Sequence, residues 1–364
     1  MTRVDELREE YDFLDFDDRI RFLIDLGEAL EPFGCPIESI AVTDQMKPGR
    51  IDFTPEPHEG SLGRMFANRQ LRLALFEAAR AEPMIAWHER AEIKSRERGE
   101  HGVSVTLADG KVLRAVLMVG AEGRGSPTRE DAGIAIAQWQ YDHRAIVSGL
   151  THEKPHDGVA WEIFYPAGPF ALLPLLDDDQ GRHRSALVWT VKERDAAGVT
   201  KLGKRAFEAE VAKRMHGIYG AVEEIAPRAA WPLGFHHSAQ ITDTRLALIG
   251  DAAHGIHPIA GQGLNLGLRD AATLVEVVAD GMRLGLEPGD AQLLARYERW
   301  RGLDAFSVSV ATDGLTRLFG IPGGAASAVR RLGMGAVQRI PALKRWFMDE
   351  ARGVSGDLPE LLKA

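Results

Sequence analysis

The run from Leu246 to Asp270 constrains the fold of this chain more than any other stretch. It reads Leu-Ala-Leu-Ile-Gly-Asp-Ala-Ala-His-Gly-Ile-His-Pro-Ile-Ala-Gly-Gln-Gly-Leu-Asn-Leu-Gly-Leu-Arg-Asp. Residues 245–249, which are apolar after Arg245, predict a buried strand that ends at Gly250-Asp251, and residues 263–280 predict a helix. Because open α/β sheets bind ligands at the carboxyl ends of their strands, the glycine-rich loop between the two predicts a ligand site.

The residue types in this loop suit a flat ligand that carries hydroxyl groups. The carboxylate of Asp251 can accept hydrogen bonds from sugar-like hydroxyls, and Gly261 and Gly263 let the backbone approach a ring closely. Amides at the start of a helix lack intrahelical partners, and they suit an electron-rich oxygen; here they belong to Gly263, Leu264 and Asn265. Pro258 fixes the direction of the loop. The alternative is a plain glycine-rich connection without a ligand, and the combination of these features argues against it.

The bulk composition fits a globular protein with one composite domain or two ordinary ones. The chain has 364 residues, of which 45% are hydrophobic and 27% charged. Its net charge of −9 argues against a nucleic-acid partner, which would need clustered Lys and Arg. The single cysteine, Cys35, excludes an intrachain disulfide and any Cys-based metal site, so no metal is expected. The charged N-terminus is not a signal peptide, and no apolar run could span a bilayer. A cytoplasmic location is expected, and peripheral contact with the inner face of the membrane stays open.

Periodicity and turn signals divide the chain into three parts. We expect helices over 1–33 and 68–81, a strand over 37–44, and a hairpin over 103–119 around Asp109-Gly110. Residues 138–232 are rich in aromatic residues and predict a separate, mainly antiparallel sheet. The tail is expected to be helical, with a break at 320–324. The expected domains are therefore 1–137 with 233–290, then 138–232 with strand 37–55 joining it, and finally 291–364.

The loop motif resembles the second FAD motif of the group A flavin monooxygenases, the para-hydroxybenzoate hydroxylase superfamily. The form of residues 257–270 is most similar to the ubiquinone-biosynthesis hydroxylases. Further matches to that family lie along most of the chain; they are 36–44, Asn68 to Leu75, 120–129 (with Glu122 in place of the usual Asp), 164–175, 340–348 and 355–359. The resemblance implies an α/β fold, with a three-layer FAD-binding domain, an inserted antiparallel substrate sheet and a C-terminal helical segment.

The resemblance also implies a set of cofactor contacts. Asp251, after Gly250, would bind ribityl or ribose hydroxyls, and Pro258 would border the flavin ring. The amides of Gly263, Leu264 and Asn265, after Gly261, would face its pyrimidine edge. Asn68 and Arg69 would contact the outer parts of FAD. Glu122 would lie near the pyrophosphate and the approach of NAD(P)H. The alternative, that Glu122 is simply a solvated carboxylate in the loop, explains it nearly as well. The histidines at 254 and 257 are read as packing or hydrogen-bonding residues, so no catalytic residue is assigned.

The implied activity is hydroxylation of a polyprenyl phenol in ubiquinone biosynthesis, with FAD, NAD(P)H and O₂. Phe170, Leu172 and Pro174 are candidate walls of the substrate pocket, and an ordinary sheet core explains them at least as well. One alternative is a non-catalytic partner protein that docks other ubiquinone enzymes or a membrane through its tail. Another is a different reaction of the superfamily, such as epoxidation or polyprenyl reduction. The residues do not distinguish NADH from NADPH.

One expected motif is missing from the sequence. The family begins with a strand, a G-x-G-x-x-G turn and a helix that bind the FAD pyrophosphate, and none of the 364 residues form that spacing. Three explanations stand at this point: a start codon placed too late, a genuinely truncated gene, or residues 1–33 covering the gap. The first is favoured, and weak or absent FAD binding is expected for the chain as written.

Overall fold

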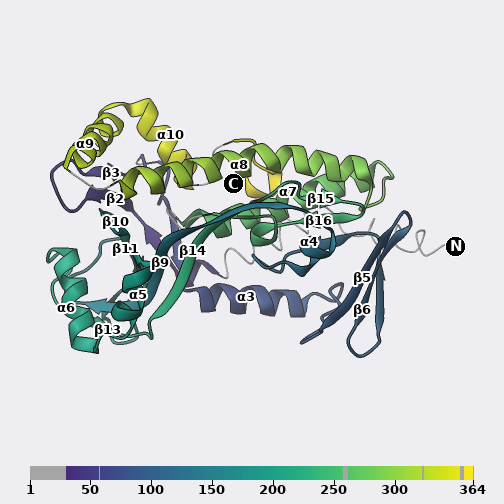
Figure 1. The fold of residues 1–364 in the computed structure, drawn as a ribbon, viewed down its shortest axis with the longest axis horizontal. Coiled ribbons are helices and arrows are strands. Elements are labelled where there is room, and N and C mark those ends of the chain that lie inside the picture. Colours follow the sequence, from purple (N-terminus) through teal and green to yellow (C-terminus); the bar gives the residue numbers. More distant parts are fainter. Residues whose placement is uncertain (1–29, 57, 257–260, 322–323, 353–355, 364) are drawn as a thin grey trace.

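The computed structural model describes residues 30–56, 58–256, 261–321, 324–352 and 356–363. It contains one large sheet, two small three-stranded sheets, a two-stranded pair and several helices (Figure 1). The helix expected over 1–33 lies almost wholly outside the described residues; at its end the structure has the short 3₁₀ turn η1 (Glu31–Phe33). Within the described residues, no helix is both long enough and apolar enough to cross a membrane.

The large sheet has the strand order β17-β14-β9-β12-β11-β10-β2-β3, and β13 pairs with β9 beside it. All pairings are antiparallel except that of β2 with β10. The strands are β2 (Ser39–Asp44), β3 (Ile51–Phe53), β9 (Ile136–His152), β10 (Val159–Tyr165), β11 (Gly168–Leu175), β12 (His183–Lys192), β13 (Val222–Glu224), β14 (Ala229–Ser238) and β17 (His254–Gly255). The aromatic-rich region thus forms the antiparallel sheet that its composition predicts, and the early strands β2 and β3 lie in it.

The two faces of this sheet pack against different helices. On the α6 face, strand residues such as Trp161 and Phe170 form the main core with α5 (Glu193–Thr200) and α6 (Lys204–Met215), two helices that the sequence did not predict. On the α9 face, Phe164 packs with Ile51 and with Met334 of α9 (Gly324–Arg339). Since side chains alternate along a strand, neighbouring residues of β10 belong to opposite faces.

The second layer is built around the Leu246–Asp270 run. Strand β16 (Leu246–Leu248) pairs in parallel with β8 (Met118–Gly120) and antiparallel with β15 (Thr242–Asp243). Helices α7 (Gln262–Arg283) and α8 (Ala291–Gly320) pack against this sheet, and the shared apolar core includes Leu248, Val277, Leu294 and Tyr297. The predicted strand at 245–249 and helix at 263–280 are confirmed.

The hairpin prediction is correct in its first half and wrong in its second. Strands β6 (Gly102–Leu107) and β7 (Val112–Ala115) pair around the Asp109-Gly110 turn, and β5 (Ile93–Gly99) adds a third strand that the sequence did not reveal. The second arm does not continue to residue 119. The chain leaves the hairpin after Ala115 because Leu117 and Met118 pack into the core of the second layer, and β8 then pairs with β16.

The remaining elements complete the two ends of the molecule. Near the start are β1 (Gly34–Ile37), paired with β4 (Gly63–Phe66), and α3 (Asn68–Ala81), which has the predicted bounds. The short α4 (Pro127–Asp131) follows β8. The tail is helical, as expected, with α8 ending at Gly320, then α9, α10 (Pro341–Arg352) and the turn η4 (Glu360–Leu362).

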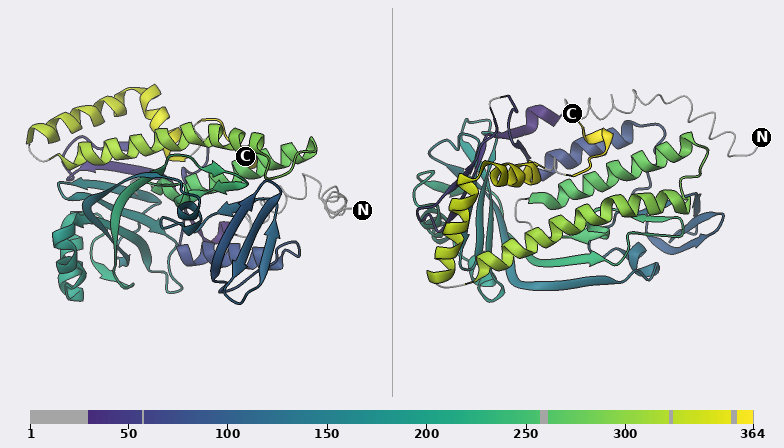
Figure 2. Two further views of the ribbon diagram at one scale, coloured as in Figure 1. Left: turned by 45° about the vertical axis from the view of Figure 1, so that its right-hand side comes forward. Right: turned by 90° about the horizontal axis from the view of Figure 1, so that it is seen from above.

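Two long strands join the layers, so no linker separates the expected domains. Strand β9 begins at Ile136 and β14 ends at Ser238, and each continues past the expected boundary, 138 and 232 respectively. In Figures 1 and 2 they extend from the large sheet toward α7 and β16. Their pairing changes register between Pro232 and Gly234. A cofactor loop carried by the second layer is thereby fixed relative to the large sheet.

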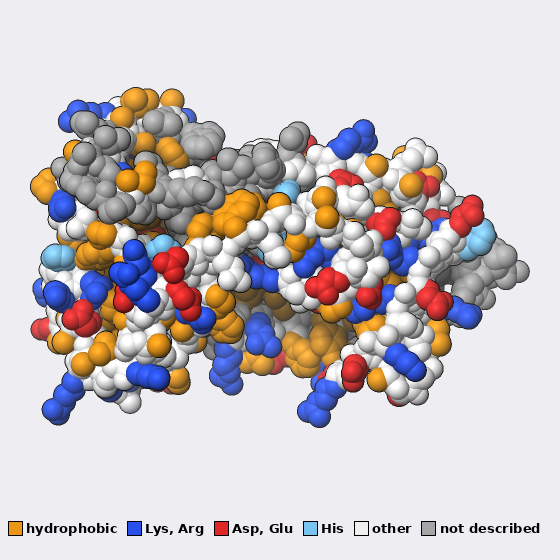
Figure 3. Space-filling view, in the orientation of Figure 1, with side chains coloured by type: hydrophobic (Ala, Val, Ile, Leu, Met, Phe, Trp, Pro, Cys, Tyr) orange, Lys and Arg blue, Asp and Glu red, His pale blue; other side chains and the backbone are white. Residues whose placement is uncertain are grey.

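Several apolar side chains of the second layer face outward. Val119 on β8 and Leu264, Leu268 and Val275 on α7 are each more than two-fifths exposed. Helix α3 has an apolar stripe but no fully buried residue. Figure 3 shows hydrophobic side chains in the hollow between the lobe of the large sheet and the lobe of β5 to β7. This side of the molecule is therefore much less closely packed than the large sheet.

Candidate cofactor-binding site

The turn after β16 is shaped by two glycines that touch. Gly250 begins the 3₁₀ turn η2 (Gly250–Ala252) with a φ of 57°, a conformation that favours glycine. Gly267 of α7 lies against it, and a Cβ on Gly267 would come within 3.2 Å of the Gly250 Cα. The turn therefore sits directly on the first part of α7, so the strand end and the helix start present one continuous surface.

Asp251 projects from this turn with its carboxylate partly open to solvent. Its side chain is 42% exposed, and Oδ2 accepts a hydrogen bond from Arg124 Nε at 3.1 Å. His236 Nε2 donates to the Asp251 carbonyl oxygen at 2.9 Å, which fixes the backbone while leaving the carboxylate accessible. The carboxylate thus keeps acceptor capacity for hydroxyls of a ligand.

The start of α7 opens toward solvent. Gly261 occupies the N-cap with a φ of 66°, and no side chain caps the helix. Leu264 and Asn265 are exposed, and a Cβ on Gly261 or Gly263 would meet nothing within 4 Å. An uncapped helix N-terminus carries partial positive charge and free amides, so it suits an electron-rich ligand edge. Pro258, the remaining predicted contact of the loop, lies outside the described residues.

A buried charge network supports the turn from behind. Asp270 of α7 is fully buried and accepts three hydrogen bonds: from the Gly250 amide at 2.9 Å, His254 Nε2 at 2.7 Å and Arg301 Nε at 2.7 Å. Burial alone would raise the pKa of Asp270, but the charges of His254 and Arg301 and their hydrogen bonds outweigh it and lower the pKa below its ordinary value. Asp270 is therefore a carboxylate that ties the turn, β17 and α8 together.

The network extends one step further into α8. Asp304 accepts hydrogen bonds from Arg301 and, at 2.6 Å, from Arg269 of α7. Within the described part of the chain, Nη2 of the fully buried Arg301 finds no acceptor. Arg301 and Asp304 were not predicted from the sequence, and Arg269 was noted only as part of the motif. An arginine on a predicted amphipathic helix is expected to face solvent until the helix that packs against it is known.

Two further arginines that the sequence analysis missed connect the loop after β8 with the cofactor loop. Arg124 donates to Asp251 and also to the carbonyl oxygens of Gly234 and Ile256, both at 3.2 Å. Arg129 is buried and donates to the carbonyl oxygen of Ala252 at 2.9 Å. The matched segment 120–129 contained this signal, but only Glu122 was singled out in it.

Glu122 itself is engaged in the entry to α4. Its carboxylate accepts hydrogen bonds from Ser126 Oγ at 2.9 Å and from the hydroxyl and amide of Thr128. Burial would raise its pKa, but these hydrogen bonds together lower it. Glu122 is thus an exposed carboxylate that is hydrogen-bonded to the start of α4, and its contact with the pyrophosphate or NAD(P)H stays a prediction.

Asn68 and Arg69 occupy the first turn of α3, after the extended Ala67 at its N-cap. Both side chains are exposed. Their predicted contact with the outer parts of the cofactor stays a prediction.

The candidate pocket walls on β11 belong to the sheet core instead. Phe170 and Leu172 are completely buried on the α6 face, among Trp161, Leu187 and Phe207. They therefore have the role of ordinary sheet core, which the sequence explained at least as well as a pocket wall. The reason is the strand alternation: the residues of β11 on the α9 face are the odd-numbered ones, Pro169, Ala171 and Leu173.

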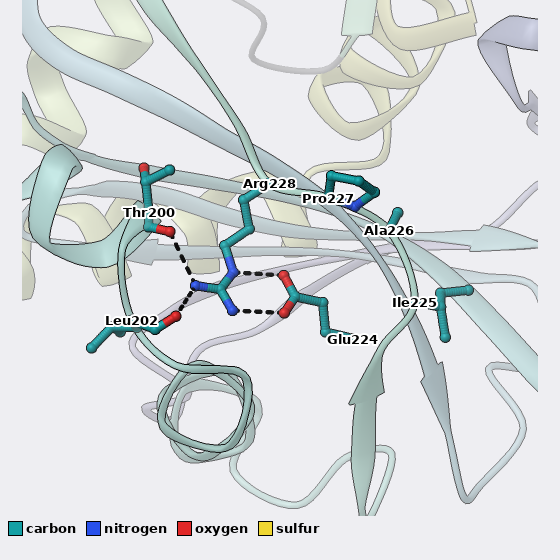
Figure 4. Close-up of a pocket in the computed structure, with 7 residues that line it drawn as sticks. All are labelled: Thr200, Leu202, Glu224, Ile225, Ala226, Pro227 and Arg228. Carbon is teal, nitrogen blue, oxygen red and sulfur yellow. Dashed lines mark hydrogen bonds and ion pairs between the residues drawn. The ribbon is translucent and has the colours of Figure 1, made fainter.

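A hollow elsewhere in the structure is lined by an arginine that is already paired within the protein. It has a volume of about 460 Å³ and lies between the end of α5 and the segment from β13 to β14 (Figure 4). Arg228 there forms two hydrogen bonds of 2.6 Å with Glu224 and donates to the carbonyl oxygens of Thr200 and Leu202. Its polar groups are satisfied within the protein, so this hollow is part of the packing of α5 and α6.

The cofactor loop fits the flavin half of FAD. An uncapped helix N-terminus, two glycines with open space beside them and an accessible carboxylate lie within one strand–turn–helix unit. These are the donors and acceptors that a flavin ring and its sugar-alcohol chain require. Asp251 and the amides of Gly263, Leu264 and Asn265 would hold the group.

Comparisons with known proteins agree with this assignment. The family described as "FAD binding domain" matches residues 27–308. Ubiquinone hydroxylase UbiL of Rhodospirillum rubrum is 41% identical over 92% of this chain and 77% of its own length. 3-demethoxyubiquinol 3-hydroxylase of Escherichia coli is 32% identical over 80% of this chain and 73% of its own length. Among solved structures, p-nitrophenol 4-monooxygenase PnpA of Pseudomonas putida superposes with a TM-score of 0.72 at 15% identity, covering 92% of this chain and 86% of that one. This last likeness concerns the fold, a para-hydroxybenzoate hydroxylase-like FAD monooxygenase fold.

Proposed function

Since this chain belongs to the FAD-binding family of flavin-dependent monooxygenases that includes the ubiquinone hydroxylases, we propose that it hydroxylates the ring of a polyprenyl phenol. The observation that carries the proposal is the unit from β16 to α7, in which an accessible Asp251 carboxylate and the uncapped start of α7 lie together and would hold the flavin half of FAD. The 41% identity to a ubiquinone hydroxylase supports the choice of substrate class.

Bound FAD would accept a hydride from NAD(P)H and activate O₂ for transfer of one oxygen atom to the ring. The chain's own residues bind and orient. Asp251 accepts hydrogen bonds from hydroxyls of the cofactor, and the amides at the start of α7 stabilise negative charge at the ring edge. Asp270 holds both in place through its bonds to the Gly250 amide and Arg301.

The direct test is turnover with labelled oxygen. Purified protein is supplied with FAD, NADPH or NADH, ¹⁸O₂ and a short-chain polyprenyl phenol, and the product is analysed by mass spectrometry. We expect one ¹⁸O atom in a hydroxylated ring, and a strong decrease in the variant Asp251→Ala. In parallel, the gene is expressed in a strain that lacks a ubiquinone hydroxylase. Absence of labelled product together with failure to restore ubiquinone would overturn the proposal.

A peripheral membrane contact through the tail is a finer proposal. Helix α10 carries Lys344 and Arg345 one turn from the partly buried Phe347 and Met348, a mixture that suits an interface with anionic lipid. Flotation with anionic liposomes tests it, with the charge-reversed variant Lys344→Glu/Arg345→Glu as the comparison. Equal flotation of the two proteins would remove this role from α10.

A further inference from the structure

Glu162 places a carboxylate beside apolar side chains on one face of the large sheet. It lies on β10 between Trp161 and Ile163, whose side chains pack on the α6 face, so Glu162 is directed to the α9 face. Its cross-strand neighbours are Val42 of β2 and Ala171 of β11. A charged side chain in this position has no role in the packing of the sheet.

The carboxylate of Glu162 has no partner within the described part of the chain. No hydrogen bond or ion pair joins it to another described residue. The nearest charged groups on the same face are Asp44 and Arg330, which lie 3.6 Å apart and pair with each other. Burial by itself raises the pKa of Glu162 to about 7. Glu162 is partly buried, and a carboxylate that the described residues leave without a partner is a group available to a ligand.

The surface beside Glu162 suits a flat apolar ligand. On the same face, neighbouring strands present small or branched apolar side chains, of which Ala171 is buried and the others are partly buried. We name this surface the sheet floor; it consists of Ala171, Leu173, Ala186, Val188 and Val147. The α6 face of the same strands, by contrast, is filled by completely buried aromatic and branched residues.

Helix α8 connects the sheet floor with the cofactor loop. Val308 packs with Ile256 and Leu266 at the start of α7. Further along, α8 approaches β10 and β11, as Figure 1 also shows. The strand that carries Glu162 and the start of α7 are thus both in contact with α8, and Glu162 is directed to the sheet face on which Phe164 packs with α9.

We propose that Glu162 binds the substrate by accepting the hydrogen bond of a phenol hydroxyl, while the sheet floor contacts the ring. This inference rests on the proposed function and adds to it the residue that selects a phenol. A hydrogen bond from the hydroxyl to a carboxylate also raises the electron density of the ring, which favours attack on it by an electrophilic oxygen donor. An ether at the same ring position could not donate such a bond.

The experiment measures binding of para-hexylphenol and of its methyl ether by calorimetry at pH 8, where the carboxylate is ionised. Neither FAD nor NAD(P)H is needed. For the unmodified chain we expect the phenol to bind about tenfold more tightly than the ether. In Glu162→Gln this preference should fall to about twofold or less, with the affinity for the ether unchanged.

Two matched variants separate recognition from general damage. Val188→Phe fills the sheet floor and should weaken both ligands, whereas Glu193→Gln removes an exposed carboxylate that pairs with Arg144 and should weaken neither. A wild-type chain with no preference for the phenol, or a full preference retained in Glu162→Gln, overturns the role of Glu162. Failure of turnover with a normal binding preference overturns the hydroxylase proposal and leaves this one standing.

Discussion

Two arginine–carboxylate pairs of this molecule use the same chemistry for different ends. Arg228 and Glu224 join the end of α5 to β14 on the outer side of the large sheet, where Arg228 also lies 3.9 Å over the Phe207 ring. Arg301 and Asp270 lie behind the cofactor loop and are completely buried. In the first pair, the Arg228 guanidinium lines a hollow and bonds only to residues around it (Figure 4). In the second, the carboxylate also holds a backbone amide and a histidine of the loop.

The difference shows how a structural ion pair can be told from one that positions a site. Burial and short distances are common to both pairs. What differs is the third partner: Glu224 is bonded to neighbours of its own sheet, whereas Asp270 is bonded to the turn that presents Asp251. Disturbing the first should therefore change stability alone, and disturbing the second should change both stability and the cofactor loop. Four predictions follow from this distinction.

Replacement of Asp270 by Asn should have the largest effect. It removes the completely buried carboxylate that pairs with Arg301, which then keeps only the partly buried Asp304 among the described residues, and breaking a buried pair typically reduces the free energy of unfolding by about 3–5 kcal/mol. Because the pKa of Asp270 is lowered in the folded state, its contribution is present above pH 4 and is lost as the pH falls through the folded-state pKa. Urea unfolding at pH 7 and pH 3.5 checks this; an equal difference between variant and wild type at both values would contradict it. Amide hydrogen exchange should also accelerate at residues 250–256.

Arg228→Met should destabilise by a smaller amount, about 2–3 kcal/mol, because Glu224 is left partly buried without its partner. The double variant Arg228→Met/Glu224→Met should recover most of this loss, since no unpaired charge remains. Hydrogen exchange at residues 250–256 should match the wild type in both variants. Faster exchange in that loop would mean that the two clusters are coupled, and the distinction between them would fail.

Glu162→Gln should stabilise the protein at alkaline pH. A rise of the pKa from 4.5 to about 7 means that the folded state holds a proton that the unfolded state has released. Each pKa unit corresponds to about 1.4 kcal/mol, so after allowance for partial exposure the ionised carboxylate costs roughly 2 kcal/mol at pH 8. Wild-type stability should therefore fall relative to the variant as the pH rises from 4.5 through 7. Urea unfolding across this range measures it, and a constant difference would contradict it.

Asp251→Asn should change stability least. Asp251 and Arg124 are both more than two-fifths exposed, and such surface pairs contribute about 0.5 kcal/mol. The same variant should weaken FAD binding by about tenfold, because the amide accepts hydrogen bonds from hydroxyls less strongly than a carboxylate. Flavin fluorescence quenching measures the affinity, and Asp243→Asn, on β15 with its carboxylate paired to Arg98, serves as the control.

The sequence was informative where local pattern and chemistry coincide. The Leu246–Asp270 run predicted its strand, its loop and its helix because apolar periodicity, Gly-Asp and Gly-x-Gly all indicated the same structure. Helix α3 was predicted to the residue because a 3.6-residue apolar period needs no tertiary information. The hairpin at Asp109-Gly110 was predicted for the same reason, but not where its second arm ends.

The remainder depended on contacts between distant segments. The placement of Arg301 against Asp270 requires two helices to be packed, and a single helix pattern does not show which charged residue faces inward. Phe170 and Leu172 were suitable for a pocket by composition, but only the pairing of β11 with β12 assigns them to the α6 face. Glu162 was overlooked because one carboxylate in an apolar run reads as an edge residue until its neighbours are known.

The continuous strand β9 makes the connection between the two layers stiff except at one interruption in its pairing with β14. It extends over 17 residues, and its partner β14 keeps regular pairing except between Pro232 and Gly234, opposite residues 140–144. Bending stiffness is lowest where ladder hydrogen bonds are interrupted. Any bending between the large sheet and the cofactor layer is therefore expected to concentrate at this interruption of the pairing.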